Sequence, residues 1–429
     1  MTAPSTAGTY VRRVIDEAID RYIGSLPAIA LQGAKGVGKT ATALQRADQA
    51  LDLSVPALRE TFRASVEPLK GLAGTTLIDE WQREPSSWDF VKRAVDAGAP
   101  AGSYVVAGSS APPGATVHSG AGRILTLRMR PLSLAERRLD TPAVSLAELL
   151  DGTNPDVEGR TNSDLADYTQ EILSTGLPGL RRFPAEIRRA QIDSYIDATV
   201  NQEFAEQGIS VRRPATLRAW MAAYAAATAT TTTYTRILEA ATPGLQEKPA
   251  RSTTTVYRDA LMRAFLLDPL DAWIPGMNHF TRLAQGPKHL LADPGIAARL
   301  LGANQRSLLR GQTSGPEMPR DGSLLGALFE HLVAMSVQTY AQAAQARVSH
   351  LRTQDGRHEV DLIVERDGAV VALEVKLATT IDDHDVRHLH WLREQLGDDL
   401  VDAAVISTGP VTYRRPDGIA VIPAALLGP

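Results

Sequence analysis

The residues most suited to chemistry lie in the segment GAKGVGKT at positions 33–40. The segment fits the pattern G-x-x-x-x-G-K-[ST] at every fixed position, with an apolar run before it and a helix-forming run after it. In such a loop the backbone NH groups face phosphates, the lysine contacts the β and γ phosphates, and the hydroxyl ligates Mg²⁺. We therefore predict a site for ATP and Mg²⁺. The residues expected to form it are Gly33, Ala34, Lys35, Gly36, Val37, Gly38, Lys39, Thr40 and Ala41.

An apolar run that ends in two carboxylates, TTLIDE at 75–80, follows the loop in the chain. This order is typical of an element that holds Mg²⁺ through Asp79 and activates the attacking water through Glu80. Ser109 follows a third apolar run and is placed to contact the γ phosphate; a turn or helix cap is the alternative for this serine.

Three arginines come next, and each could bring positive charge to the transition state of phosphoryl transfer. Arg123 is the first candidate, in cis or across a subunit interface, ahead of Arg128 and Arg130. The alternative is a solvated surface arginine.

A second cluster of chemical interest lies near the C-terminus, in EVDLIVERDGAVVALEVK. A turn at 366–368 should pair two strands, so that Asp361 approaches Glu374 and Lys376, while Glu330 on a preceding helix completes the set. Carboxylates so arranged suit Mg²⁺ beside a phosphodiester, with Lys376 positioning water. An ordinary solvent-exposed ion pair is the alternative, although a charge in mid-strand at Glu374 is costly without a partner.

Length and composition set the frame for these sites. The chain has 429 residues, more than one core usually supports, so we expect roughly two to four domains. It is 44% apolar, contains no cysteine and has a net charge of −4, which excludes disulfides, thiolate chemistry and polyanion binding by bulk charge. No run of about 18 apolar residues and no secretory signal is present, so we predict a cytoplasmic protein without a membrane span.

The apolar patterning predicts three domains. Residues 1–150 should form an α/β domain with a parallel sheet, because short apolar runs at 28–32, 75–78 and 103–107 alternate with helical runs such as 11–22, 41–50 and 88–97. Residues 151–310 read as helical. Residues 320–429 should form an α/β domain after a Gly- and Pro-rich linker at 307–322, with a helix at 324–346 and strands at 359–364, 370–375 and 403–407.

In this order, GAKGVGKT, LIDEWQREP, VVAGSS, GAGRI and RPLSLAER resemble motifs of the AAA-type ATP-binding proteins of bacteria and archaea that carry a C-terminal domain of unknown function. Glu136 matches the acidic position of the last motif, and TGLPGL at 175–180 and LADPGIAARLLG at 291–302 extend the resemblance. It implies an AAA-like core, a winged-helix unit in the middle, and a C-terminal restriction-endonuclease-like fold of the PD-(D/E)xK type.

Two functional hypotheses follow. The first is an ATPase that couples ATP binding and hydrolysis to a module directed at double-stranded DNA, with Arg251 and Arg258 on a recognition helix and nuclease-like chemistry at the C-terminal cluster. The second is a nucleotide-dependent switch that binds a protein partner and cleaves nothing. Packing of the helix at 251–267 within its own domain is the alternative to DNA contact, and homo-oligomerisation is left open.

Overall fold

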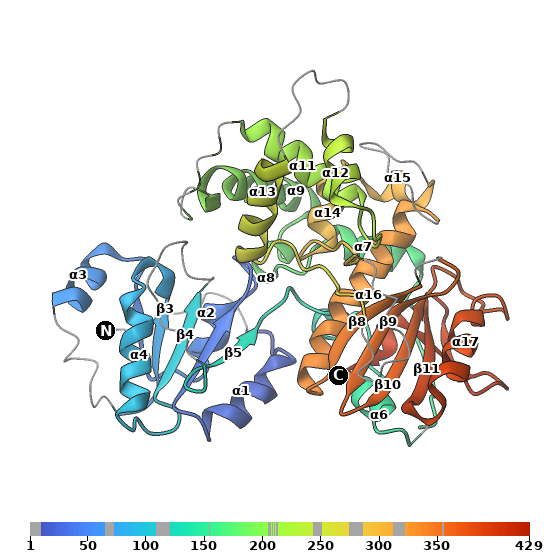
Figure 1. Ribbon diagram of the computed structural model, residues 1–429, viewed down its shortest axis with the longest axis horizontal. Helices are drawn as coiled ribbons and strands as arrows, with labels where there is room; N and C mark the ends of the chain where they lie inside the picture. The colour runs from blue at the N-terminus through green and yellow to red at the C-terminus, as the bar shows by residue number, and fades with distance from the viewer. Residues whose placement is uncertain are drawn as a thin grey trace.

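The computed structural model describes residues 10–64, 73–108, 121–153, 155–204, 207, 209, 211, 213–242, 251–273, 286–311, 322–353 and 356–429. Figure 1 shows three lobes: a sheet with helices in blue, a helical lobe in green and yellow, and a second sheet in orange and red. The long helix α16 (Leu324–Ala343) lies between them. Ser109 and most of the predicted linker at 307–322 lie outside the described residues.

The N-terminal sheet is parallel and has the order β2-β3-β4-β1-β5 in the described residues. Because the strands are parallel, the ends of β1, β3, β4 and β5 share one edge, and Gln32 pairs with both Gly108 and Arg128 there. The elements of this lobe are α1 (Ile15–Ile23), β1 (Ala28–Gln32), α2 (Lys39–Leu44), β2 (Gln49–Asp52), α3 (Pro56–Ala64), β3 (Thr76–Asp79), η2 (Trp81–Arg83), α4 (Ser86–Asp96), β4 (Tyr104–Gly108), β5 (Leu125–Arg128) and α5 (Leu134–Arg137).

The predicted parallel sheet is confirmed, and one local prediction is wrong. The helix expected at 41–50 ends at Leu44, and the chain then forms β2. Only Ala50 and Leu51 are apolar in β2, so its sequence has too little periodicity to mark a strand. β2 forms because its backbone pairs with β3.

The middle lobe is helical. Its elements are α7 (Leu165–Leu173), α8 (Pro178–Arg181), α9 (Ala185–Ala198), η3 (Thr199–Glu203), α11 (Pro214–Ala226), α12 (Tyr234–Ala241), α13 (Arg251–Arg263), α14 (Pro294–Leu300) and α15 (Gln305–Leu309). After α13 two stretches run antiparallel, with bridges between Leu267 and Leu291 and between Leu270 and Lys288. We call residues 266–271 and 286–292 the paired segments. A Thr-rich run at 228–235 lies against the second of these segments, because His289 exchanges backbone hydrogen bonds with Ala229 and Thr230.

The C-terminal sheet has the order β7-β12-β13-β11-β10-β9-β8 in the described residues. Its elements are β6 (Val144–Ser145), α6 (Leu146–Leu150), β7 (Gly159–Arg160), β8 (Arg347–Arg352), β9 (Glu359–Arg366), β10 (Ala369–Val375), α17 (Arg387–Leu396), η4 (Gly397–Asp399), β11 (Leu400–Ser407), β12 (Val411–Arg414), β13 (Ala420–Pro423), η5 (Ala424–Leu426) and β14 (Leu427–Gly428). The two-residue turn between β9 and β10 has positive φ at Asp367 and Gly368, which matches the twist of the strands.

Residues 144–160 differ from the sequence-based domain boundary near 150. β7 pairs with β12 of the C-terminal sheet, β6 pairs with β14 in a separate two-stranded sheet, and α6 contacts β10 and β11, so this segment belongs to the C-terminal lobe. These strands are two residues long, and only the distant partner makes them strands.

One apolar core connects the lobes through α16. This helix is buried around most of its circumference, with Leu328, Phe329 and Leu332 fully enclosed, as expected for a helix packed on all sides. No helix in the described ranges combines the length and the apolar character needed to cross a membrane.

Three histidines hold the backbone around the paired segments. Each donates from its Nε2–H to a backbone carbonyl oxygen: His289 to Thr232, His331 to Leu291, and His350 to Gly286. Burial lowers the pKa of His289 and His331 to about 4 and that of His350 to about 3. The fold therefore favours neutral imidazoles here.

We predict that acid weakens the protein through these groups. A histidine whose folded pKa lies below its usual 6.5 contributes stability above pH 6.5, and that contribution is lost as the pH falls toward about 4. Urea unfolding between pH 7 and 4.5 should show the free energy of unfolding falling, by about 1.4 kcal/mol per pH unit for one such group. In His331→Gln the fall should be smaller, whereas His390→Gln, at a partly exposed site, serves as the control. An identical pH slope in wild type and His331→Gln would contradict this origin.

Candidate functional site

The loop at 33–40 follows β1 directly, and its backbone curves around the side chain of Lys39. Lys39 is 7% exposed, and its Nζ donates to the carbonyls of Gly33 and Ala34 at 2.8 and 2.9 Å. Gly36 and Gly38 have φ of 79° and 102°, values that side chains rarely adopt, so the glycines are needed for the turn itself. The ammonium thus lies where a phosphate-binding lysine belongs.

Asp79 and Glu80 stand at the same edge of the sheet, at the end of β3. Asp79 is 7% exposed and shares a hydrogen bond with the Thr40 side chain. Burial, followed by the charge of Glu80, raises the pKa of Asp79 to about 6. This hydroxyl and carboxylate are oxygen donors of the kind that Mg²⁺ takes.

Glu80 is held in a strained backbone position. Its φ is 52°, and its side chain accepts a 2.6 Å hydrogen bond from Gln82. A Cβ on Gly108 would lie 2.2 Å from the Gln82 side chain, so the glycine at the end of β4 makes room for this contact. Strain of this kind at an acidic residue is common where a side chain must face a reacting group. Ser109, the next residue, is outside the described part.

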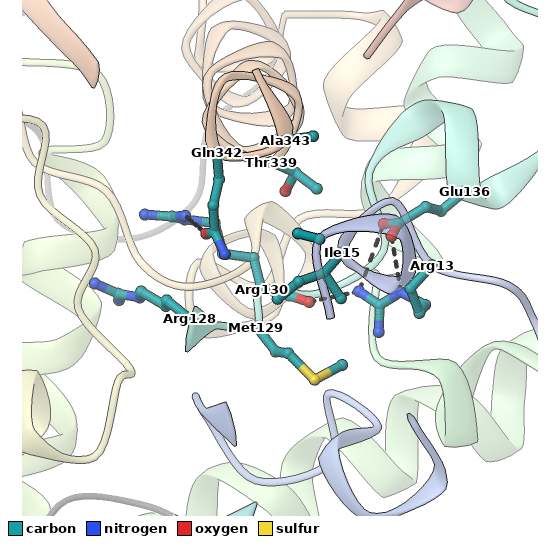
Figure 2. Close-up of a pocket in the computed structure, with 10 residues that line it drawn as sticks. Arg13, Ile15, Arg128, Met129, Arg130, Glu136, Thr339, Gln342 and Ala343 are labelled. Carbon is teal, nitrogen blue, oxygen red and sulfur yellow. Dashed lines mark hydrogen bonds and ion pairs between the residues drawn. The ribbon is translucent and has the colours of Figure 1, made fainter. Parts of the chain in front are cut away.

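Arg13 clamps the loop and was not identified from the sequence. Its guanidinium donates to the carbonyl of Val37 at 2.7 Å and to that of Arg130 at 2.8 Å, and it pairs with Glu136 at 2.9 Å. Figure 2 shows Arg13 facing Glu136, while Arg128 and Arg130 extend to the opposite side. Glu136 also accepts from the backbone NH of Val14 and caps α5. The acidic position of the RPLSLAER motif is thus a support for the loop.

The middle lobe covers the loop. The Tyr195 hydroxyl of α9 donates to the carbonyl of Lys35 at 3.2 Å, and a Cβ on Gly38 would lie 3.9 Å from Pro178. The turn that precedes Pro178 is fixed by Asp293, which accepts from the NH of Gly176 at 2.6 Å. The TGLPGL and LADPG segments of the sequence therefore meet beside the nucleotide loop.

The structure does not bring Arg123 to the loop. It precedes β5 at the opposite edge of the sheet, where it is half exposed and pairs with Asp96 at 2.9 Å. Arg128 and Arg130 lie at the correct edge, but both bind Asp268 of the middle lobe, at 3.1 and 2.7 Å. A role for Arg123 across a subunit interface is the part of that prediction that this geometry leaves open.

The residues of the C-terminal cluster lie close together, as the predicted pairing of their two strands requires. Asp361 on β9 and Glu374 on β10 are neighbours: the NH of Asp361 donates to Glu374 at 3.2 Å, and the NH of Val375 donates to Asp361 at 2.9 Å. Lys376 Nζ lies 3.5 Å from Glu374. Glu330 on α16 faces the same cluster and is linked to Asp361 through one ammonium group.

That ammonium belongs to Lys288, which no motif or pattern in the sequence marks. It enters from the paired segments, is 1% exposed, and lies 2.7 Å from Glu330, 3.0 Å from Asp361 and 3.4 Å from Glu359. Burial raises the pKa of Glu330 to about 8 and that of Glu374 well above its usual range. Burial also opposes the ionisation of Asp361, but Lys288 and Lys376 outweigh it and lower its pKa.

A groove of about 890 Å³ opens from this cluster. One wall carries the carboxylates and Lys376, and another is formed by the Thr-rich run at 228–233, to which the sequence assigned no function. Three arginines and two histidines also line the groove, and none of them was anticipated: Arg236, Arg352, Arg387, His384 and His388.

Three families match successive parts of the chain. Residues 25–137 match the family described as AAA domain, residues 165–307 a domain of unknown function (DUF8612), and residues 325–427 a domain of unknown function (DUF4143). The N-terminal lobe is therefore a P-loop ATPase domain of the AAA type, as its motifs indicated.

The chain is also similar to individual proteins. It is 24% identical over 422 residues to the uncharacterized proteins Rv2008c of Mycobacterium tuberculosis and Mb2031c of Mycobacterium bovis, covering 96% of this chain and 83% of each relative. Among solved structures, the Walker-type ATPase PABY2304 of Pyrococcus abyssi is 14% identical, with a TM-score of 0.37 over 66% of this chain and 94% of its own. The Aeropyrum pernix ORC2 protein, solved in ADPNP and ADP complexes, is 14% identical, with a TM-score of 0.30 over 68% of this chain and 93% of its own. The assignment of the AAA domain rests on the family match and the loop.

We predict that Gly33→Ala damages the nucleotide site by a steric clash. A Cβ at this position would lie 2.2 Å from the carbonyl oxygen of Met129, a backbone atom that cannot move aside without shifting β5. The loss should be on the order of 2 kcal/mol in unfolding free energy, together with loss of nucleotide binding. Gly179→Ala in the adjacent α8, where a Cβ meets nothing within 4 Å, is the matched control. Equal melting temperatures and equal nucleotide affinities for the two variants would contradict the clash.

Proposed function

We propose that the chain is an ATP hydrolase. Lys39 binds the β and γ phosphates, Thr40 and Asp79 hold Mg²⁺, and Glu80 orients the attacking water. The observation that supports this best is the hydrogen bond between Thr40 and Asp79, which joins the loop to the end of β3 beside the buried Lys39. Mg²⁺ bound there neutralises charge on the phosphates during transfer.

We further propose that the nucleotide state acts on the middle lobe. Tyr195 contacts the loop directly, and Arg13 links Val37 to Arg130, which in turn binds Asp268. A rearrangement of the loop on hydrolysis therefore changes contacts that fix the middle lobe and α16. The three helices α11, α12 and α13 followed by the paired segments have the order of a winged-helix unit.

Two uses of this coupling remain in competition. DNA binding by α13 is one, although Arg258 stacks on Tyr234 and pairs with Asp259 within its own lobe. A switch that binds a partner protein is the other. ATP turnover measured with and without duplex DNA separates them, because stimulation by DNA supports the first, whereas unchanged turnover supports the second.

A second candidate function is metal-dependent phosphodiester cleavage at the C-terminal cluster. The close approach of Asp361, Glu374 and Lys376 on a polar groove favours it. The carboxylates of Asp361, Glu374 and Glu330 are oxygen donors of the kind that Mg²⁺ takes. They can hold the ion only if Lys288, whose ammonium contacts Glu330 and Asp361, moves away from them. A metal held there would supply charge to the leaving phosphate oxygens. Lys376 would position the water.

The ATPase proposal predicts two distinct defects. Lys39→Ala should lose ATP turnover and weaken ATP binding, because the phosphate contact is removed. Glu80→Gln should retain ATP but stop turnover, because an amide cannot activate water. Phosphate release and nucleotide affinity are the two measurements. The controls are Lys92→Ala and Glu17→Gln, two changes in surface ion pairs. Wild-type turnover in Lys39→Ala would refute the assignment of the site.

The nuclease proposal predicts nicking of plasmid DNA by the full chain with Mn²⁺ and ATP. Lys376→Ala should remove the nicking while leaving ATP turnover intact, since Lys376 lies in a different lobe from the P-loop. Equal nicking by both proteins would point to a contaminant, and no nicking by either would leave the cluster without a catalytic role.

A further inference from the structure

Lys288 fills the centre of the C-terminal carboxylate cluster. Its Nζ is within hydrogen-bond distance of Glu330 and Asp361, at 2.7 and 3.0 Å, although the residue belongs to the middle lobe. The side chain is almost completely buried, and no other residue of the paired segments reaches the cluster among the contacts of the described residues. A cation already occupies the position at which the carboxylates converge.

An ammonium and a divalent ion cannot share these oxygens. Mg²⁺ requires oxygens at about 2.0–2.1 Å, which places it at nearly the same point as Nζ. Two positive charges at that separation repel strongly in a buried site. Metal binding by Glu330 and Asp361 therefore requires Lys288 to leave.

The backbone that carries Lys288 fixes the position of the side chain. The NH of Lys288 donates to the carbonyl of Leu270, and the NH of Leu270 donates to the carbonyl of Lys288, both at 2.9 Å. In the neighbouring pair of the two segments, the NH of Asp268 donates to the carbonyl of Leu290 at 2.9 Å. Asp268 is in turn bound by Arg128 and Arg130 at the edge of the nucleotide domain. Withdrawal of Lys288 is thus a movement of the paired segments, and these are attached to the ATPase domain.

We propose that Lys288 is an internal cation that closes the C-terminal site: it holds the carboxylate cluster in place of a divalent metal, which binds only when the paired segments draw Lys288 out. The inference rests on the proposed metal site and adds its regulation by the middle lobe.

The test measures Mn²⁺ binding to the full chain by isothermal titration calorimetry, without DNA or ATP. Lys288→Gln keeps a donor for Glu330 and loses the charge, while Lys288→Met removes both. Each should bind Mn²⁺ roughly tenfold or more tightly than wild type, because one repelling charge is gone. Lys288→Arg should remain as weak as wild type. Lys92→Met, on the surface, is the control for loss of a lysine elsewhere.

Adding Asp361→Ala to Lys288→Gln should abolish the gained affinity, which places the metal in the cluster. Equal affinity in wild type and Lys288→Gln would overturn the role of Lys288 and leave the metal site intact. Absence of binding in every variant, with folding verified by circular dichroism, would overturn the metal site itself and with it the inference. Lys288→Gln addresses the case in which Lys288→Met does not fold, because its amide still satisfies one carboxylate.

Discussion

The contact of Asp268 with Arg128 and Arg130 is the interaction on which the assembly of the lobes depends. Asp268 is buried, and burial alone would raise its pKa, yet the two guanidinium groups outweigh this and lower it. A buried carboxylate that loses such partners typically costs about 3–5 kcal/mol. The pair joins the carboxyl edge of the N-terminal sheet to the first paired segment, and Gln338 of α16 accepts from Arg130 at 2.8 Å. The N-terminal lobe, the middle lobe and α16 therefore meet around Arg130.

Continuous contacts run from this point to both candidate sites. Toward the nucleotide, the Arg130 carbonyl accepts from Arg13, which holds Val37 of the loop. Toward the C-terminus, the backbone pairing that begins at Asp268 carries Lys288 into the carboxylates. The pocket in Figure 2 lies on this route, and its volume of about 10 Å³ is room for a single water at most. Close packing of this kind has few intermediate arrangements, which is the condition under which a small change at one site becomes a discrete change at another.

The sequence predicted well wherever a short local pattern carries the information. The loop, the strands β1, β3 and β4 of the N-terminal sheet, α16, and the pairing of Asp361 with Glu374 follow from motif spacing, apolar periodicity and a two-residue turn. It could not predict Arg13, Lys288 or the transfer of residues 144–160 to the C-terminal lobe. Each of these acts through a partner more than 40 positions away, and nothing in the neighbouring residues marks them. Arg123 was selected by its motif, and only the direction of β5 shows that it lies at the wrong edge.

The charges at the C-terminal cluster bear on why Lys288 can occupy the site while the carboxylates still attract a metal ion. Among the described residues, four carboxyl groups gather there, from Glu330, Glu359, Asp361 and Glu374, against the ammonium groups of Lys288 and Lys376 and the guanidinium of Arg352, which pairs with Glu359 at 3.0 Å. A site built only for stability would match its charges, because unmatched buried charge is costly. Here burial, followed by the charge of Asp361, raises the pKa values of Glu330 and Glu374, so their ionisation is opposed even with lysines beside them. A divalent ion brings twice the charge of Lys288 to the same oxygens, so the cluster favours the metal electrostatically, and it is the backbone pairing of the middle lobe that keeps the lysine in place.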